Sequence, residues 1–362
     1  MGLRQYLFGP LREAIARTFN AKVAPNHEAR NGRPLTDRRA ARREALGLPA
    51  YQYFSDLHRV SQDMIWNSVI DTLDRAEPEL KSRFRAIAGR ARGSLHLDPA
   101  LAIPRYISAV DIHCMPGNYV RSAGEDDLIA GALYDRGGYL YAPGSGPKGD
   151  GLGRTSLAFL RRRLPAFEPT RILDLGCGTG GPTLVYAEAF PAAEVHGVDI
   201  GAAMLRYGHL RAESEGRRIH FSQQDAARTN FAAASFDLVL SHILFHETSA
   251  RAIPAMLAEC RRLLGPGGVM LHVELPNPEQ LPDAFTKVIF DGDAHYNNEP
   301  FWMRLHDLDW PAMLEAAGFA PAHTEIAPTR VQAFMPPSAD YPQGHWVDGP
   351  FPLTTILATV PS

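Results

Sequence analysis

Apolar and polar positions follow two different patterns along the chain, and the pattern changes near residue 150. From residue 152 onward, short apolar runs of a length typical for buried strands alternate with segments of helical spacing. We expect strands at 171–175, 194–200, 218–223, 236–241, 268–274, 320–326 and 354–360. Helices are expected at 152–164, 183–190, 202–215, 250–264 and 308–317. This alternation predicts an α/β fold, with a mostly parallel sheet of seven strands and helices on both faces.

The first 150 residues have a mainly helical pattern instead. In 2–19, apolar residues recur at helical spacing, and Pro10 is expected to kink the helix. A membrane-surface helix and an Arg-rich targeting peptide both fit this segment, but we favour an arm that packs on its own domain or on a second subunit. Residues 20–34 are polar and turn-rich, which predicts a loop. Further helices are expected at 36–46, at 53–73 and from Pro78 onward. We interpret 1–150 as an extension that covers a site or forms a dimer, and 151–362 as the main domain.

One stretch, RILDLGCGTGGPT at 171–183, joins a buried strand to a helix through four glycines. Pro182 suits the first turn of the helix, and the glycine turn directs free backbone N–H groups at a ligand. The spacing formally satisfies G-x-G-x-x-G, which is a weak signal on its own. Asp174 at the strand end would repel a pyrophosphate but accept hydrogen bonds from an ammonium group. Asp199, at the end of the next strand, suits ribose hydroxyls and therefore fits either kind of cofactor.

Four sequence motifs stand in order between residue 170 and the C-terminus: DLGCGTG, GVDI, QQDAARTNFAAASFDLVLSHILFHE and LLGPGGVMLHVELP. Together they resemble the motifs of the class I S-adenosylmethionine (SAM) dependent methyltransferases. The resemblance implies a Rossmann-like sheet whose last two strands form an antiparallel edge, and SAM as the cofactor. Carried over motif by motif, it implies that SAM is bound by Asp174, Gly176, Gly178, Gly180, Asp199, Ile200, Met204, Asp225, Ala226 and Ser241.

The same resemblance assigns roles within that set. Gly176 and Gly178 would cradle the methionine part of SAM, and Asp199 would bind the ribose diol. Asp225 would accept from the exocyclic amine of the adenine, and the apolar side chains of the set would pack on its ring. Helix capping is the alternative interpretation of Asp199 and Asp225.

The methyl acceptor should meet the residues that follow the fourth strand. His246 is expected to act as a general base or to orient the acceptor, with His242 and Glu247 beside it. A metal held by His242 and His246 is an alternative, but no third ligand is assured, so we expect no metal. The plainest interpretation is a pair of hydrogen-bonded histidines at a helix start.

Two further segments are expected near the acceptor, because in this fold the segment before the first core strand and insertions after the fifth strand lie there. The glycine- and tyrosine-rich segment 134–151 is predicted to be a loop, and so is 291–302 within an insertion at 276–306. Core packing and loop decoration are the alternatives. The expected acceptor contacts are Tyr134, Tyr139, Tyr141, Glu274, Tyr296 and Trp302. Weaker candidates are Asp111, His113 and Tyr119.

Composition narrows the partners. With 362 residues and a formal net charge of -3, the chain has no global basic field for nucleic acid. The Asn/Asp-Pro-Pro-aromatic motif that acts on nucleobase amines is absent, since Ser241-His242-Ile243-Leu244 stands in its place. Three widely spaced cysteines fit a reducing cytoplasm, and no apolar run is long enough to span a membrane.

We therefore expect a SAM-dependent methyltransferase that acts by in-line displacement on an oxygen, nitrogen or sulfur atom of a small polar molecule. A homodimer through the N-terminal helices is expected as well. A non-catalytic SAM-binding module is the first alternative, because the motifs bind cofactor without proving turnover. An NAD-type oxidoreductase is the less favoured one.

Overall fold

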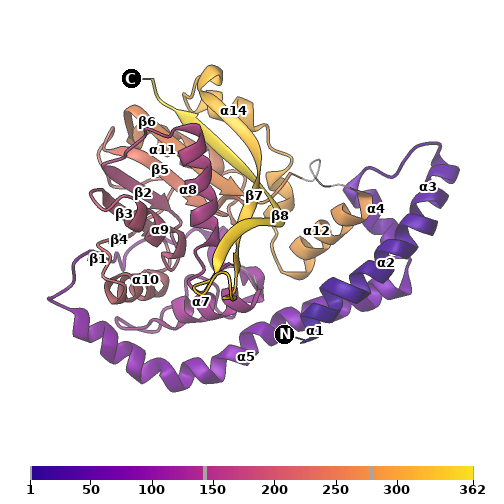
Figure 1. Cartoon of the computed structure of the whole chain (residues 1–362), viewed down its shortest axis with the longest axis horizontal. Coiled ribbons are helices and arrows are strands. Elements are labelled where there is room, and N and C mark those ends of the chain that lie inside the picture. The colour runs from indigo at the N-terminus through magenta and orange to yellow at the C-terminus, as the bar shows by residue number, and fades with distance from the viewer. Residues whose placement is uncertain (1, 142–144, 278–280, 282, 362) are drawn as a thin grey trace.

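The fold is built on one sheet of eight strands, which run in the order β1-β4-β3-β2-β5-β6-β8-β7 (Figure 1). The computed structural model describes residues 2–141, 145–277, 281 and 283–361. Strands β1 to β6 are parallel, β8 is antiparallel to β6, and β7 is antiparallel to β8. The strands are β1 (Ser94–His96), β2 (Arg171–Leu175), β3 (Glu194–Asp199), β4 (His220–Gln223), β5 (Phe236–His242), β6 (Leu264–Glu274), β7 (Thr324–Met335) and β8 (His345–Thr359).

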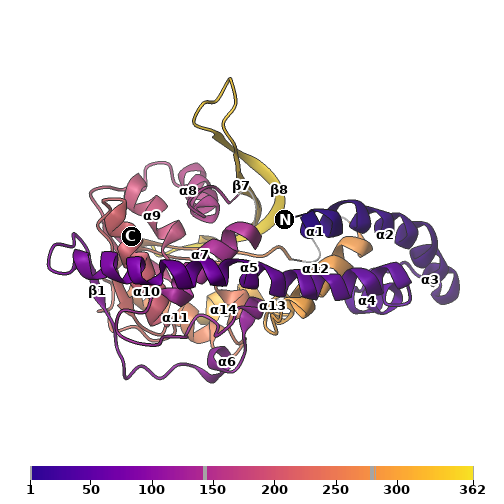
Figure 2. The ribbon, with the colours of Figure 1, turned by 90° about the horizontal axis from the view of Figure 1, so that it is seen from below.

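The expected α/β architecture is confirmed, including the antiparallel edge formed by the last two strands. All seven expected strands are present, and the sheet has one more. The additional strand, β1, pairs in parallel with β4 and brings a part of the first 150 residues into the sheet. Three residues of extended backbone are too few to produce a recognisable period in the sequence. Strands β7 and β8 are longer than expected and form a hairpin that projects from the body (Figure 2).

Helices cover both faces of the sheet. Along β5, Val239 belongs to one apolar cluster, whereas Leu238 and Leu240 belong to another, and all three are fully buried. The first cluster includes α11 (Ile253–Leu263) and α14 (Trp310–Ala316), and the second includes α8 (Gly151–Arg163), α9 (Gly181–Ala189) and α10 (Ala202–Ser214). Complete burial of each such aliphatic side chain stabilises the sheet by about 1.5–3 kcal/mol.

The N-terminal helices form another apolar cluster at one end of the molecule (Figure 1). The chain is helical as α1 (Gly2–Tyr6), α2 (Arg12–Thr18) and α3 (Ala24–Asn31), which are joined by π-helical turns at 7–11 and 19–23. The break expected at Pro10 is confirmed, because the neighbouring Gly9 has non-helical backbone angles. The loop predicted at 20–34 was wrong for most of its length. Val23 packs on the buried cluster around Phe19, and the helix ends only at Gly32, whose φ is +66°.

A single helix of 39 residues, α5 (Pro49–Ile87), runs beneath the sheet domain (Figures 1 and 2). The sequence predicted that Pro78 begins a new helix. This prediction was wrong, because Pro78 lies inside α5. Its ring is exposed to solvent, so water can satisfy the carbonyl that loses its backbone donor. None of the described helices combines the length and the hydropathy needed to span a membrane.

The segment predicted as a loop at 291–302 is mostly helical. α12 (Ala284–Tyr296) packs on α4 (Arg38–Ala45), and α13 (Trp302–Leu305) follows it. Phe285, Val288 and Ile289 are buried in the N-terminal cluster, which explains why this segment folds as a helix. The insertion therefore joins the N-terminal helices to the sheet domain. Residues 278–280 and 282 of the expected insertion lie outside the described residues.

The glycine-rich segment predicted as a loop begins as a helix, α7 (Ile129–Tyr141). Gly137 lies against α5, where a Cβ atom would be only 2.0 Å from the Trp66 ring. Glycine is therefore needed here for close helix packing and not for a turn. Because α7 is a helix, it places its tyrosines at defined positions beside the sheet.

Candidate active site

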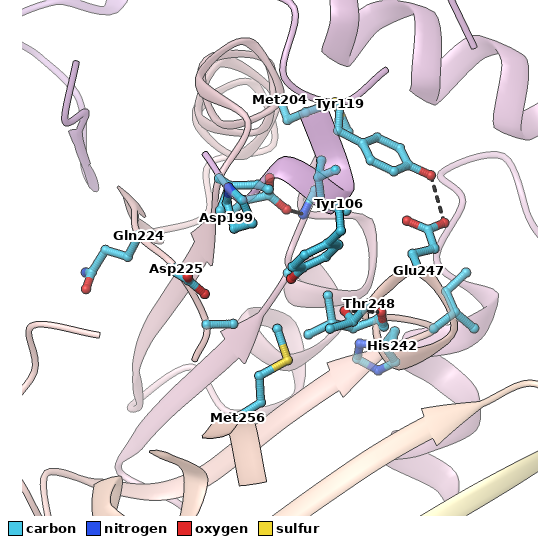
Figure 3. Close-up of a pocket in the computed structure, with 18 of the residues that line it drawn as sticks. Tyr106, Tyr119, Asp199, Met204, Gln224, Asp225, His242, Glu247, Thr248 and Met256 are labelled. Atoms are coloured by element: carbon cyan, nitrogen blue, oxygen red, sulfur yellow. Dashed lines mark hydrogen bonds between the residues drawn. The ribbon is translucent and has the colours of Figure 1, made fainter. Parts of the chain in front are cut away.

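A cavity lies at the carboxyl ends of the parallel strands, where ligands bind in open α/β sheets. The end of β3 and the segment after β5 contribute Asp199 and Leu244 to this first cavity (Figure 3). A second cavity adjoins the first, because Tyr134, Gly178 and His242 line both. The two cavities together form one elongated site across the edge of the sheet.

The glycine turn after β2 forms part of the wall of both cavities. Gly176 and Gly178 have φ angles of +64° and +53°, a backbone region that favours glycine. A Cβ atom at residue 176 would also lie 2.5 Å from Leu244 Cδ1. The turn therefore requires glycine, and it leaves the cavity wall free of side chains at this point.

Asp199 anchors the centre of the first cavity. Its Oδ2 accepts from the Gly178 backbone N–H at 2.9 Å, and its Oδ1 accepts from the Gly201 N–H at 2.7 Å. Burial raises the pKa of Asp199 to about 6, although these two hydrogen bonds oppose the rise. The carboxylate is thus held in a fixed position, ionised above that pH, and exposed to the cavity.

Asp174, at the end of β2, reaches the second cavity. Its Oδ2 accepts from the Thr183 hydroxyl at 2.6 Å. Its Oδ1 has no hydrogen-bond partner although it is buried, and it lies 3.7 Å from His242 Nδ1. A buried carboxylate oxygen without a donor is costly, so this atom fits an ammonium group of a bound ligand.

The far end of the first cavity is mainly apolar. Asp225 and Gln224 contribute polar groups there (Figure 3). Asp225 Oδ1 accepts from the Ala227 N–H at 2.8 Å. The apolar lining here includes Ile200, Met204, Ala226, Leu244 and Met256. This combination suits a flat aromatic base with an amine at its edge.

Two of the expected cofactor residues do not line either cavity. Gly180 precedes α9, and its missing side chain would face Phe221 at 3.1 Å. Ser241 is fully buried, and its hydroxyl forms a hydrogen bond of 2.7 Å with His272 Nδ1. Both residues therefore support the strands and the turn from behind, and the expected contact of Gly180 and Ser241 with the cofactor stays a prediction.

The three expected catalytic residues occupy different positions. His242 lines both cavities, and Glu247 lines the first. His246 lines neither of them, because its ring is turned inward and buried. Its Nδ1 lies 3.2 Å from Glu274 Oε2, and its Nε2 lies 3.6 Å from both Glu247 Oε1 and Glu299 Oε2.

Glu247 is at the centre of a largely buried group of ionisable side chains, which we call the His–Glu cluster: His113, His246, Glu247 and Glu299. His113 Nε2 lies 2.9 Å from Glu247 Oε1, and His113 Nδ1 lies 3.0 Å from Glu299 Oε1. The Tyr119 hydroxyl donates to Glu247 Oε1 at 2.7 Å (Figure 3).

The charges in the cluster shift one another's pKa values. Burial alone would lower the pKa of His113, but Glu299 and Glu247 raise it to about 10. Burial likewise acts to lower the pKa of His246, and the carboxylate of Glu274 outweighs it, so the pKa rises. For Glu247, burial acts upward, but the neighbouring His113 lowers its pKa below the ordinary value. The cluster therefore stabilises the ionised carboxylate of Glu247 beside the first cavity.

Several cluster residues were missed or undervalued in the sequence. His113 and Tyr119 were only weak candidates, and Glu299 was not identified. His113 is held from outside the sheet domain, because Trp66 and Gln62 of α5 donate to its carbonyl at 2.7 and 3.0 Å. No short spacing could have revealed this arrangement, since the residues come from three distant segments.

The expected tyrosines differ in how close they lie to the site. Tyr134 lines both cavities and packs edge to face on Tyr119, with ring centroids 5.5 Å apart. Tyr141 lines the second cavity, and its ring centroid is 5.4 Å from that of His113. Tyr139 lies at the exposed rim of the same cavity. Tyr106, which the sequence did not suggest, lines the first cavity (Figure 3).

Three other expected acceptor contacts, Glu274, Tyr296 and Trp302, line neither cavity, so their contact with the acceptor stays a prediction without support from the cavities. Glu274 is buried and accepts from the Phe245 N–H at 2.6 Å. Tyr296 packs beside His58, with ring centroids 6.0 Å apart. Trp302 is buried against Phe290. Glu274 ends β6, whereas Tyr296 and Trp302 belong to the helices α12 and α13.

Comparison with known proteins gives matches centred on the sheet. Residues 172–268 match the model of a family described as a methyltransferase domain. Demethylmenaquinone methyltransferase of Thermus thermophilus is 37% identical over 110 residues, which are 30% of this chain and 49% of that protein. Demethylmenaquinone methyltransferase of Porphyromonas gingivalis is 30% identical over 182 residues, which are 49% of this chain and 69% of that protein. The chain spans about half of the length of several such relatives.

Among solved structures, the chain is similar to phosphoethanolamine N-methyltransferase 2 of Haemonchus contortus in complex with S-adenosyl-L-methionine. That similarity has a TM-score of 0.39 and 19% sequence identity, and it covers 58% of this chain and 53% of the other.

Proposed function

Because the chain belongs to the class I SAM-dependent methyltransferases, we propose that it transfers the methyl group of SAM to a small molecule bound beside Glu247. One observation carries the proposal: Asp174, Asp199 and Asp225 place three carboxylates along one elongated site. Their order matches the three polar parts of SAM, namely its ammonium group, its ribose and its adenine amine.

The chain's own groups explain how SAM would be held. Asp174 Oδ1 is buried without a donor and would accept from the methionyl ammonium group. Asp199 would accept from the ribose hydroxyls, since both of its oxygens are already oriented by backbone N–H groups. The apolar end of the first cavity would enclose the adenine beside Asp225. When bound, SAM supplies a methyl carbon that is activated by the positively charged sulfur.

The acceptor would lie on the side of the His–Glu cluster. Tyr134 and Tyr141 form aromatic walls there, which exclude water and restrict the orientation of a small molecule. Of the three expected catalytic residues, Glu247 lines a cavity and also belongs to the His–Glu cluster. Glu247 would therefore take a proton from the acceptor. Several relatives carry names of quinone methyltransferases, one of them a C-methyltransferase, so carbon joins oxygen, nitrogen and sulfur as an acceptor atom.

The alternatives fit the site less well. A pyrophosphate of a nicotinamide dinucleotide would approach the unpartnered oxygen of Asp174, and two negative charges would repel each other. A binding module without catalysis would have no need for a buried cluster of ionisable groups next to the cofactor cavity. The cluster therefore favours an enzyme.

We also propose that the protein is cytoplasmic, has no nucleic-acid partner, and forms a homodimer through its N-terminal helices. Tyr53, Val60 and Met64 of α5 are about half exposed, which gives this helix an apolar face toward solvent. The three cysteines are free, as expected in a reducing compartment. Light scattering after size-exclusion chromatography tests the dimer; a monomer at micromolar concentration would refute it.

Methyl transfer is tested by incubating the protein with methyl-deuterated SAM and a small-molecule extract of the organism that encodes it. We expect S-adenosylhomocysteine to form together with an ion that carries the labelled methyl group, whose fragments identify the acceptor atom. The control is the same incubation with the Asp199→Ala variant. Stoichiometric SAM binding without any S-adenosylhomocysteine, across extracts from several growth conditions, would contradict the proposal and favour a binding module.

A further inference from the structure

We propose that His113, His246 and Glu247 bind a divalent transition-metal ion, with Glu299 as a further ligand, at the boundary between the core and the cofactor cavity. The expectation of no metal rested on the lack of a third ligand near His242 and His246. The fold supplies other ligands from distant segments. One nitrogen or oxygen atom from each of His113, His246 and Glu247 can be chosen so that all three lie within 4.8 Å of one another.

The separations of these atoms are close to those around a metal ion. With bonds of about 2.1 Å and tetrahedral angles, two ligand atoms are about 3.4 Å apart. His113 Nε2 and Glu247 Oε1 are 2.9 Å apart, and His246 Nε2 and Glu247 Oε1 are 3.6 Å apart. Small side-chain rotations therefore suffice to bring all three atoms to bonding distance.

Both imidazoles are oriented for metal binding by a second carboxylate. His113 Nδ1 lies 2.7 Å from Asn297 Nδ2 and 3.0 Å from Glu299 Oε1, and His246 Nδ1 faces Glu274 Oε2 at 3.2 Å. A carboxylate that accepts from Nδ1–H leaves the lone pair of Nε2 free for a metal, the arrangement that commonly surrounds metal-bound histidine. In both residues the Nε2 atom is the one that faces Glu247.

Glu299 gives an independent indication of a missing cation. Its side chain is almost completely buried, and its Oε2 has no hydrogen-bond partner. This oxygen is directed toward the cluster, 3.6 Å from His246 Nε2. Burying a carboxylate oxygen without a partner is costly, and a cation at the cluster would remove that cost.

The charge balance supports the same conclusion. Glu247, Glu274 and Glu299 bring three carboxylates together, and among the described residues no Lys or Arg forms an ion pair with them. The three carboxylates bring three negative charges, and a bound divalent ion would offset two of them. A mixed nitrogen and oxygen ligand set suits Zn²⁺, Fe²⁺, Co²⁺ or Mn²⁺ better than Mg²⁺ or Ca²⁺.

The backbone around the cluster is strained, which is typical of functional sites. His113, Ile243 and Asn298 have positive φ angles of 57°, 47° and 57°. A positive φ is especially unusual for a β-branched residue such as Ile243. These residues lie in the three segments that carry the cluster, so the fold holds them there against a local cost.

The site would select acceptors with oxygen donors, an inference that rests on the proposed function. Glu247 lines the first cavity, so a molecule bound there could supply an oxygen as an additional ligand to a metal held by the cluster. A divalent ion stabilises an ionised phenol or enol at neutral pH by lowering the pKa of the bound hydroxyl. Small molecules with one or two such oxygens are therefore the class that fits.

Metal binding is tested with metal-free full-length protein, without SAM, by titrating Co²⁺ and recording visible absorption and calorimetric heat. We expect one equivalent to bind, and Zn²⁺ to displace it. His246→Ala and the isosteric Glu247→Gln should each weaken binding at least tenfold. The matched control is His58→Gln, because His58 Nε2 forms a buried pair with Asp293 Oδ1 at 3.2 Å outside the cluster, and its Co²⁺ affinity should be unchanged.

Two results would overturn the metal site: no saturable binding by the wild-type protein, or binding that survives in a folded Glu247→Gln variant. Thermal unfolding monitored by circular dichroism identifies variants that do not fold. If His246→Ala does not fold, the Co²⁺ affinity of Glu247→Gln decides whether the metal site exists. SAM titration of the same samples separates the two proposals. A wild-type protein that binds SAM but no metal refutes the metal site alone, whereas metal binding without methyl transfer to any acceptor refutes only the function.

Discussion

Replacing Asp199 by alanine should weaken SAM binding by a predictable amount. In the free protein, the Asp199 carboxylate is fixed by the N–H groups of Gly178 and Gly201 at 2.9 and 2.7 Å. No rearrangement is therefore needed before it accepts from the ribose hydroxyls. Hydrogen bonds to a charged group contribute about 1.5–3 kcal/mol. Because about 1.4 kcal/mol corresponds to a factor of ten, the dissociation constant should rise roughly 10- to 150-fold.

The chain offers a matched control at the opposite edge of the sheet. Asp237, in β5, accepts from the backbone N–H groups of Thr170 and Arg171 at 2.7 and 2.9 Å, but it lines neither cavity. Asp237→Ala removes the same kind of interaction, two backbone N–H groups bound to one carboxylate. Both variants should therefore lose stability, whereas only Asp199→Ala should lose SAM affinity.

The assay is calorimetric titration of SAM at pH 8, where the Asp199 carboxylate is ionised, with thermal unfolding to verify the fold of each variant. A folded Asp199→Ala variant whose SAM affinity stays within about twofold of the wild type would refute the role of this residue. Equal loss of affinity in Asp237→Ala would show that the effect is a general consequence of destabilisation.

Three further predictions concern pH, packing and turnover. SAM affinity should fall below pH 6, by up to about tenfold per pH unit. The reason is that Asp199, whose pKa is about 6, becomes protonated and loses the negative charge that accepts hydrogen bonds from the ribose. Titrations of SAM between pH 5 and 8 should show this slope, and the Asp199→Asn variant should lack it. Gly137→Ala should destabilise the protein by roughly 1–3 kcal/mol in urea unfolding, because the added methyl group would meet the Trp66 ring. Gly138→Ala should be neutral or stabilising, because no atom lies near its added methyl group. His246→Ala should lower kcat by roughly 100-fold or more. SAM affinity should change little, because the His246 ring lines neither cavity. Equal losses of kcat and SAM affinity would show that His246 has a structural role.

The sheet and the cofactor side of the site could be predicted because the relevant information is local. Asp174 ends a strand of continuous apolar residues and precedes a glycine turn, so its place at the edge of the sheet follows from the strand itself. Asp199 stands in the same relation to β3. Parallel strands end at a common edge, which brings such residues together without any knowledge of long-range contacts.

The helical corrections have a different origin. Gly137 and Gly138 suggested a loop, but packing of α7 on Trp66 requires a glycine and outweighs its low helix propensity. The polar residues at 291–296 suggested a loop as well, yet Asp291 is held by Arg38 and Arg42 of α4 at 3.3 and 3.2 Å. In both cases a partner far away in the sequence determines the local structure.

The acceptor side could not be predicted for the same reason. His113 and Glu247 are 134 positions apart, and the His113 segment is held beside the end of β5 by α5 and by Asn298, whose side chain donates to the Asp111 carbonyl. His246 was expected to act as a base or to orient the acceptor, but its partners were not identified, because they depend on how three segments meet. A single sequence contains no periodicity that reports such a meeting.

The most direct test of the central claim is a calorimetric comparison of SAM and NADH as ligands of the full-length protein. The three carboxylates along the site predict that SAM binds with a stoichiometry of one and that NADH does not compete with it. If NADH binds and SAM does not, the glycine turn serves a dinucleotide, and the assignment of Asp174 to an ammonium group is wrong.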